Sequence, residues 1–171
     1  MKRTLLILVT LTVLAACGGG YGSGGGNRVY SGPPPTATVT TIDVNLESHA
    51  TTNTPYGTST GYAPPVSDVN TGSFIQFHNS DNDTHTATLI AGNPPQFPAA
   101  DPFTNAAVTQ SGTRISSGFT SGALTGGASS QLIFVDQSGV YLFGCFFHYA
   151  SNGMRAAIVV NGSPQRPPAG Y

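Results

Sequence analysis

Residues 144–154 read GCFFHYASNGM, and they lie between two apolar runs. Both runs are rich in β-branched, aromatic and small apolar residues, which favours two neighbouring strands joined by a short loop. A loop of this kind can fold its Cys145, His148 and Met154 side chains around a single point. A thiol, an imidazole and a thioether that meet at one point can hold a metal ion from three sides.

A fourth ligand has to come from elsewhere in the chain, and His85, within DTHT at 83–86, is the best candidate. Two imidazoles and a thiolate in a plane, with a weak axial thioether, are the ligand set of an electron-transfer copper site. Zinc is the main competing metal, but structural zinc sites use Cys, His and carboxylate ligands and rarely a thioether. The four residues therefore predict one copper ion, with zinc or a metal-free domain as the alternatives.

The N-terminus predicts export and lipidation. A basic pair and a short apolar run open the chain, and LAAC follows at 14–17. The run is shorter than the ~20 residues that span a bilayer, and its flanks are typical of an export signal. The segment 14–17 resembles the lipobox of bacterial lipoproteins, in which the Cys is lipidated and becomes the mature N-terminus. We expect residues 1–16 to be a signal peptide and Cys17 to tether the protein to the bacterial cell envelope. Ordinary secretion or an uncleaved anchor is the alternative.

The cysteine count fits this prediction. Cys17 and Cys145 are the only cysteines in the chain. If Cys17 carries a lipid, Cys145 is a lone thiol in a compartment where disulfides form. Such a cysteine is either reactive or occupied, and metal ligation would occupy it. A Cys17–Cys145 disulfide is the alternative, and it is disfavoured because Cys17 precedes a glycine-rich segment while Cys145 lies among phenylalanines.

Composition divides the rest of the chain. Residues 17–35, rich in glycine and then proline, predict a disordered tether that is stiffer near its end. Residues 36–163 suit one domain, and 164–171 form a Pro-rich tail. The 171 residues include 6 Lys+Arg and 7 Asp+Glu, with a formal net charge of −1. This balance provides no basic patch for nucleic acid and no strong field to steer a charged partner.

The predicted domain is all-β. Short segments of β-branched and aromatic residues alternate with turn residues, which is typical of an antiparallel sandwich. Residues 48–69 are polar and rich in turns, and a short helix is expected near 103–108. The expected strands are 36–46, 73–78, 85–90, 116–119, 131–135, 140–145 and 156–160.

From about residue 72 to residue 160, the chain resembles the cupredoxin family, small blue-copper proteins such as plastocyanin. Residues 72–79, GSFIQFHN, are similar to the strand that precedes the family's first ligand loop, and His85 follows where its first His ligand falls. Residues 138–145, SGVYLFGC, are similar to the family's G-x-Y-x-x-x-C run. The resemblance implies a Greek-key β-sandwich with one type 1 copper at one end. The implied ligands are His85, Cys145, His148 and Met154.

The chain also departs from the family pattern. Five residues separate His148 from Met154, where plastocyanin-like loops usually have four. Thr86 follows His85, where plastocyanin has an Asn that braces the loop. Residues 93–128 are longer and less similar to the family than the rest.

The remaining polar residues carry weaker signals. We expect His78 to be structural, His49 to be solvated, and Asp81 and Asp83 to form turns through their side chains. Nothing in the chain resembles a Ser-His-Asp triad, a P-loop or a glycosidase pair of carboxylates.

Together these features predict a one-electron carrier at the bacterial cell envelope that is not an enzyme. Its redox partner is expected to dock transiently over the exposed edge of His148, through a small and weakly charged patch. One alternative is a protein that stores or delivers copper without a redox relay. The other is a metal-free sandwich used for adhesion or assembly.

Overall fold

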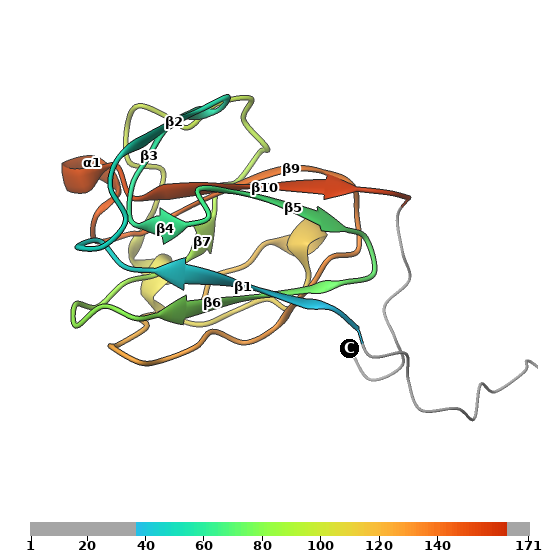
Figure 1. Ribbon diagram of the computed structural model, residues 1–171, viewed down its shortest axis with the longest axis horizontal. Coiled ribbons are helices and arrows are strands. Elements are labelled where there is room, and N and C mark those ends of the chain that lie inside the picture. Colours follow the sequence, from blue (N-terminus) through green and yellow to red (C-terminus); the bar gives the residue numbers. More distant parts are fainter. Residues whose placement is uncertain (1–36, 164–171) are drawn as a thin grey trace, which may run out of the picture. The chain divides into compact units, whose positions relative to one another are not determined.

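The computed structural model describes residues 37–163 (Figure 1). They form two four-stranded sheets and a separate two-stranded hairpin. The predicted signal peptide, the lipidation site Cys17, the tether and the tail at 164–171 lie outside the described residues. Within the described range, none of the helices has the length and apolar character needed to cross a membrane.

The first sheet has the strand order β4-β1-β6-β8. Its strands are β1 (Val39–Val44), β4 (Tyr62–Ala63), β6 (Phe74–Asn79) and β8 (Ile133–Phe134). The second sheet has the order β5-β10-β9-β7. Its strands are β5 (Val66–Asn70), β7 (Thr88–Leu89), β9 (Gly139–Gly144) and β10 (Arg155–Asn161).

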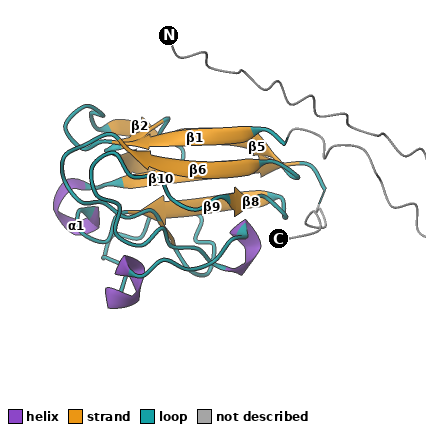
Figure 2. Cartoon of the chain, turned by 90° about the horizontal axis from the view of Figure 1, so that it is seen from below, coloured by secondary structure: helices purple, strands orange, loops and turns teal. Residues whose placement is uncertain are grey.

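The hairpin and three helical turns complete the described part. The hairpin consists of β2 (Thr52–Thr54) and β3 (Gly57–Ser59). Two 3-10 turns, η1 (Asn105–Val108) and η2 (Ile115–Ser117), and one α-helical turn, α1 (Tyr149–Asn152), lie in loops outside the sheets (Figure 2).

The sandwich is a Greek key with mixed strand directions. β1 runs parallel to β6, and β10 runs parallel to β5, while the other pairs in the sheets are antiparallel. From β4 to β9, each connection carries the chain from one sheet to the other. Parallel neighbours need a long crossover, and the passage through the opposite sheet supplies it. The all-β Greek-key prediction is confirmed, but the expectation of purely antiparallel pairing is wrong.

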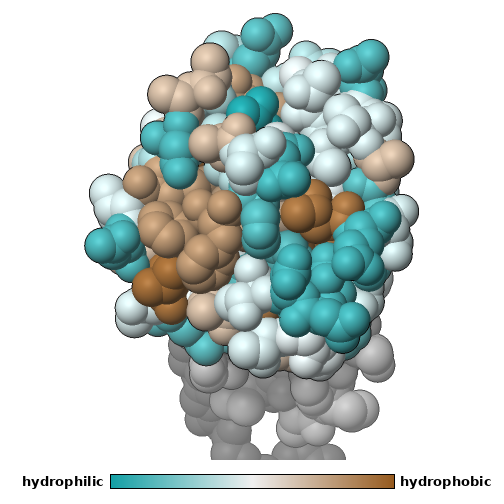
Figure 3. Space-filling view, turned by 90° about the vertical axis from the view of Figure 1, so that its left-hand side faces the viewer, coloured by the Kyte–Doolittle hydropathy of each residue, from teal (hydrophilic) through white to brown (hydrophobic). Residues whose placement is uncertain are grey.

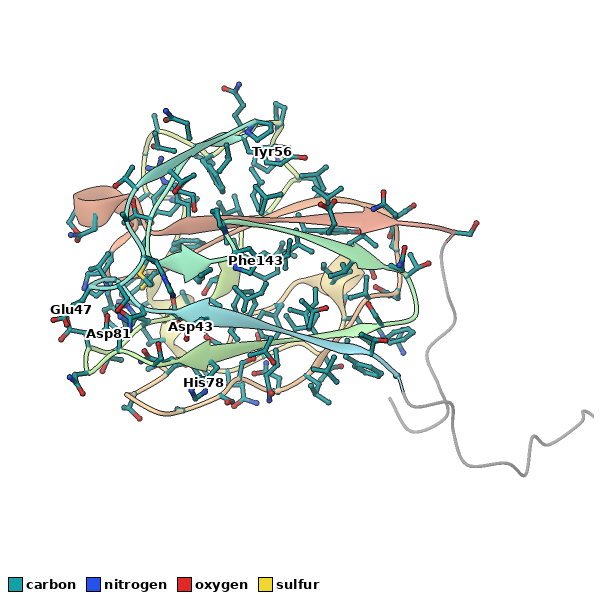
Figure 4. The ribbon with its side chains drawn as sticks, in the orientation of Figure 1. Asp43, Glu47, Tyr56, His78, Asp81 and Phe143 are labelled. Carbon is teal, nitrogen blue, oxygen red and sulfur yellow. The ribbon has the colours of Figure 1, made fainter. Side chains whose placement is uncertain are left out.

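The core lies between the two sheets. Alternation along β6 directs Ile75 and Phe77 inward, where both are completely buried. Phe77 meets Phe143 of β9 across the sandwich, with ring centroids 5.2 Å apart. Figure 4 shows Phe143 in this interior, whereas His78 points from the outer face of the first sheet. Truncating a buried Phe to Ala costs about 3–5 kcal/mol, so these rings hold the two sheets together.

A second apolar cluster covers the outer face of β9 and β10. Leu142 and Ala157 point to this side, and the chain around Ile90 and Phe97 packs over them. Tyr149 of α1 belongs to the same cluster. The loop after β9 is therefore attached to the sandwich by an aromatic side chain of its own.

Several strand predictions need correction. Residues 48–69, expected to be turns, contain β2 to β5, because backbone pairing needs no apolar side chains. The strand expected at 85–90 shrinks to β7, since His85 forms only an isolated bridge with Leu124. The strand expected at 116–119 is wrong. η2 occupies the first part of this range, and the Asp136 carboxylate accepts bonds from the Ser116 N–H and hydroxyl.

The other expectations fare better. The helix expected near 103–108 appears as η1. His78 is structural, with its Nδ1 3.0 Å from the Ser129 hydroxyl oxygen. His49 is not simply solvated, because it is half-buried and its Nε2 lies 2.7 Å from an Asp43 carboxylate oxygen.

Candidate metal centre

Three of the four predicted ligands meet at one end of the sandwich. His85 Nδ1 and His148 Nδ1 lie 3.1 Å apart. The Cys145 Sγ atom is 3.8 Å from the first nitrogen and 3.6 Å from the second. Within residues 37–163, this is the only group of three His, Cys, Asp or Glu side chains whose donor atoms could hold one metal ion.

These distances fit a shared metal ion. Metal–nitrogen bonds of ~2.0 Å and metal–sulfur bonds of ~2.3 Å place donors on one ion no more than roughly 4.3 Å apart. All three separations fall below that limit. Two imidazole nitrogens and a thiol sulfur, turned toward one another without a charged partner between them, are a donor set that suits copper or zinc.

Met154, the fourth predicted ligand, is completely buried. Its carbonyl accepts a hydrogen bond of 3.1 Å from the Cys145 N–H, so the two ends of the loop are tied together. Gly61 covers its side chain: a Cβ added there would lie 2.8 Å from the Met154 Cγ and 3.3 Å from its Sδ. Gly61 also has a φ of +73°, so another side chain would be strained and would displace the thioether.

The loop after Cys145 accommodates its extra residue as one helical turn. α1 starts after His148 and ends before Gly153, whose φ of +66° is left-handed. The His148 carbonyl accepts bonds from the Asn152 and Met154 N–H groups. Five residues between His148 and Met154 thus form a closed turn that returns Met154 to Cys145.

Tyr149 anchors this turn. Its hydroxyl donates a 2.7 Å hydrogen bond to the Pro98 carbonyl, and the Arg155 guanidinium lies 4.2 Å from its ring centroid. Gly144 leaves room for the ring, because a Cβ there would lie 2.5 Å from Tyr149 Cδ2. Part of the long 93–128 segment therefore serves to hold the ligand loop.

His85 is held from both its backbone and its ring. Its N–H and carbonyl both bond to Leu124. Its second ring nitrogen, Nε2, lies 3.1 Å from an Asp81 carboxylate oxygen, and the two side chains are 0% and 1% exposed. The expectation that Asp81 only forms a turn is therefore incomplete, because Asp81 also contacts a predicted ligand.

Thr86, next to His85, connects that histidine to the loop that starts at Cys145. Its N–H donates to Cys145 Sγ at 3.3 Å, and its hydroxyl accepts a 2.8 Å bond from the Phe146 N–H. One residue thus contacts the sulfur and fixes the start of the ligand loop. The sequence carried a hint of this role only in Thr86's position beside His85.

Burial shifts the pKa values of two of the ligands in opposite directions. Burial raises the pKa of the Cys145 thiol, although N–H groups of Thr86, Phe147 and His148 act to lower it. Burial, and then the electrostatic interaction with His85, lowers the pKa of His148. At neutral pH His148 is therefore neutral and able to ligate, whereas Cys145 has to lose its proton as a metal binds.

The Asp81 carboxylate stays ionised despite its burial. Burial alone would raise its pKa, but hydrogen bonds from the Asp83 N–H, the His85 ring and the Leu46 N–H hold it well below the usual range. Figure 4 shows Asp81 and Glu47 at the end of the sandwich where α1 lies. Asp81 was missed as part of the site because an aspartate in a turn usually caps backbone.

The surface at this end is partly apolar. Figure 3 looks onto it and shows apolar areas bordered by polar side chains. Phe147, two residues after Cys145, is 43% exposed, and it is one of two exposed large hydrophobic side chains in the described part of the chain. Phe146 and His148 are half-buried. Among the three grouped ligands, only His148 reaches toward solvent.

No protein-family model matches the chain, and no curated protein matches it. Solved structures do. The purple cupredoxin from Nitrosopumilus maritimus aligns with 71% of this chain and 99% of its own, at 17% identity and a TM-score of 0.46. An amicyanin variant in its Cu(I) form aligns with 71% of this chain and 82% of its own, at 16% identity and a TM-score of 0.42. A reduced amicyanin variant at pH 4 aligns with 75% of this chain and 87% of its own, at 14% identity and a TM-score of 0.44.

All three TM-scores lie below 0.5, so the description of the fold rests on the strand order of this chain. Both sheets contain one parallel pair, the ligand loop joins β9 to β10, and His85 precedes β7. The chain has a cupredoxin-like fold. The cupredoxin-like arrangement brings a histidine from the middle of the chain to a cysteine and a histidine near its end.

Proposed function

We propose that this chain is a type 1 copper protein that carries single electrons at the bacterial cell envelope and catalyses no reaction of its own. The observation that carries the proposal is the meeting of His85 Nδ1, His148 Nδ1 and Cys145 Sγ within 3.1–3.8 Å of one another. Met154, buried beside Cys145, supplies the weak fourth ligand. Bound copper would provide a one-electron couple between Cu(I) and Cu(II).

The residues around the site favour rapid transfer. His85 is fixed by Asp81 and Leu124, Cys145 by Thr86, and the loop by Tyr149. Ligands that cannot move change little when the charge of the site changes, so the energy of reorganisation is small. Phe119 and Phe143 belong to the same buried apolar cluster as Cys145 and Met154, and this cluster would keep water from the inner side of the site.

Burial favours electron transfer over copper delivery. His85, Cys145 and Met154 are completely buried, and only half-buried His148 offers a route for a ligand exchange. A delivery site has to hand its ion to another protein, which needs exposed ligands. Slow loss of copper to a chelator, together with reversible one-electron voltammetry, separates these functions. Rapid loss of Cu(I) to an acceptor would contradict the proposal.

The deciding experiment is a copper titration of the full chain in detergent, followed by visible spectroscopy. We expect an intense thiolate-to-copper band at one equivalent of Cu(II). Cys145→Ser should abolish it, while Cys17→Ser, the matched control, should keep it. His78→Gln is the control for the histidine ligands. A colourless wild-type protein after copper addition would instead favour a metal-free sandwich.

The lipid anchor at Cys17 forms a separate part of the proposal, supported by LAAC at 14–17. We expect the wild-type protein to sediment with membranes and Cys17→Ser to appear in the soluble fraction. Mass spectrometry of the mature N-terminus would test lipidation directly. Equal membrane association of both proteins would contradict the anchor without affecting the copper site.

A further inference from the structure

We infer that Asp81 is a positioning residue for the metal centre, which directs His85 Nδ1 toward the metal and stabilises the oxidised site relative to the reduced one. This inference rests on the proposed function for its redox part only. The orientation of the imidazole can be tested without any metal. The observation behind it is the 3.1 Å contact between Asp81 Oδ2 and His85 Nε2, with both side chains sealed from solvent.

The carboxylate is itself held in place. Oδ2 also accepts a 2.8 Å hydrogen bond from the Leu46 N–H, and Oδ1 accepts a 3.0 Å bond from the Asp83 N–H. The Asp81 N–H donates to Asn79 Oδ1 at 2.9 Å. Two bonds from backbone N–H groups thus fix the side chain of Asp81, and a third fixes its backbone. Within residues 37–163, His85 is the only ionisable side chain to which it is hydrogen-bonded.

The loop around Asp81 is tied to the segment at 124–126. The amide of Asn79 donates to the carbonyls of Asp83 and Leu124, at 2.8 and 2.9 Å. Gly126 approaches so closely that an added Cβ would lie 2.6 Å from the Asp81 carbonyl oxygen. Asp81 therefore cannot follow His85 if the ring turns, and the imidazole has to adapt to the carboxylate.

This contact selects one form of the imidazole. A neutral imidazole donates from one nitrogen and offers a lone pair on the other. A carboxylate only accepts, so Nε2 has to carry the proton and Nδ1 has to present its lone pair. Nδ1 is the atom that faces Cys145 and His148. Such an outer partner also makes the ligating nitrogen more basic.

The Asp81 carboxylate also adds a negative charge that is buried from solvent. A copper site with a thiolate and two neutral imidazoles would gain one positive charge on oxidation from Cu(I) to Cu(II). A buried anion behind His85 favours that state, because little water separates the two charges. Asp83 is two residues away in the same loop but is exposed, and no hydrogen bond joins its carboxylate to His85. It provides a matched control of equal charge.

The first measurement uses the metal-free full chain in detergent with labelled histidine. Nitrogen NMR of the ring atoms of His85, at a pH where the ring is neutral, should show the proton on Nε2. In Asp81→Asn the carboxamide can donate as well as accept, and a population with the proton on Nδ1 should appear. Asp83→Asn should match wild type. A wild-type His85 protonated on Nδ1 would overturn the inference whether or not either variant folds.

The second measurement compares copper affinities and reduction potential in the same three proteins. Asp81→Asn should lose about tenfold more affinity for Cu(II) than for Cu(I), as outer partners of metal ligands commonly contribute. A tenfold ratio equals a rise of about 59 mV in a one-electron potential. Asp83→Asn should change the ratio less than about twofold, since solvent screens its charge.

The outcomes separate this inference from the proposed function. Equal shifts in both variants, or none in Asp81→Asn, would overturn the redox part of the role of Asp81. A wild-type chain that binds no copper but shows the proton on Nε2 would overturn the proposed function and leave the positioning role standing. Copper binding by the wild-type chain, with no change of the His85 tautomer in Asp81→Asn, would support the proposed function and overturn the positioning role of Asp81.

Discussion

The two histidines of the candidate site are held in opposite ways. His85 is completely buried, bridged to Leu124 through its backbone and bonded to Asp81 through its ring. His148 is half-buried and held by the turn in which it lies. Within residues 37–163, no hydrogen bond joins the outer ring nitrogen of His148 to another group.

In the proposed electron carrier, this difference would divide two tasks between the histidines. A rigid ligand keeps the geometry constant between charge states, and His85 has the contacts for that. A ligand that reaches the surface offers electrons a short path to a partner, and His148 has the exposure for that. Substitutions at the buried histidine, His85, and at the half-buried histidine, His148, should therefore have different consequences.

Removal of each imidazole should produce the largest contrast. His85→Gly should abolish the copper band and lower the free energy of unfolding by about 3 kcal/mol, because Asp81 is left buried without its partner. His148→Gly should also lose the band but destabilise less. Added imidazole should restore the band in His148→Gly, since the hole opens toward solvent, and should fail in His85→Gly. Visible titrations and denaturant unfolding of the metal-free proteins measure both effects.

Equal rescue of the two variants would show that the buried and exposed sides are interchangeable. His78→Gln is the control for a histidine outside the site. It removes one hydrogen bond with Ser129, and copper binding should be unaffected.

Acid should destabilise the two sides of the metal-free protein in different pH windows. The pKa of His148 is lowered in the folded state, so below about pH 6.5 the unfolded chain takes up this proton first and stability falls. The pKa of Asp81 is also lowered, so its contribution is present above about pH 4 and is lost below that value. Each proton can change the unfolding free energy by at most about 1.4 kcal/mol per pH unit.

Substitutions can assign the two windows. His148→Gln should flatten the dependence below about pH 6.5 and keep the lower window. Asp81→Asn should remove the loss of stability below about pH 4 and keep the dependence below about pH 6.5. Chemical unfolding in the presence of a chelator, from pH 7 to pH 3, measures both profiles. A lower window that persists in Asp81→Asn would mean that other carboxylates dominate the acid response.

The sequence predicted the local half of this site better than the distant half. Cys145, His148 and Met154 lie on one loop between two strongly apolar strands, so their spacing alone predicted that they are neighbours. His85 lies on a distant segment, so the sequence offered it only as the best candidate for the fourth ligand, and the family resemblance supported that choice. The role of Asp81 was missed, because an aspartate in a turn bonds backbone far more often than a ligand.

Close approach between distant segments was equally hard to predict from the sequence. Gly61 covers Met154, and it belongs to a stretch whose Thr, Ser and Asn residues resemble a loop although they pair as strands. Such residues give a weak strand signal because backbone bonds, not side-chain burial, hold them. The brace from residues 93–128 was unpredictable for the same reason, since it consists of bonds such as Tyr149 to Pro98.

A substitution at the end of α1 should disturb His148 alone. Gly153→Ala places a side chain at a φ of +66° and should lower the unfolding free energy by about 1 kcal/mol. The ring signals of His148 should shift in NMR spectra, while His85 should keep its tautomer. Gly92→Ala is the matched control, because its φ is +82° and its site is open. Similar shifts of His85 and His148 would show that the two sides are mechanically coupled.

The smallest expected effect concerns the partner, which we propose docks over His148. The exposed ring of Phe147 and the net charge of −1 favour apolar contact over electrostatic steering. Raising the salt concentration from 10 to 200 mM should therefore change the rate of electron exchange with the physiological partner by less than about threefold. Phe147→Ser should slow exchange more than that without changing the potential. A steep fall in rate with salt would mean that charged groups such as Glu47 and Asp83 guide docking, and that His148 is not approached through an apolar patch.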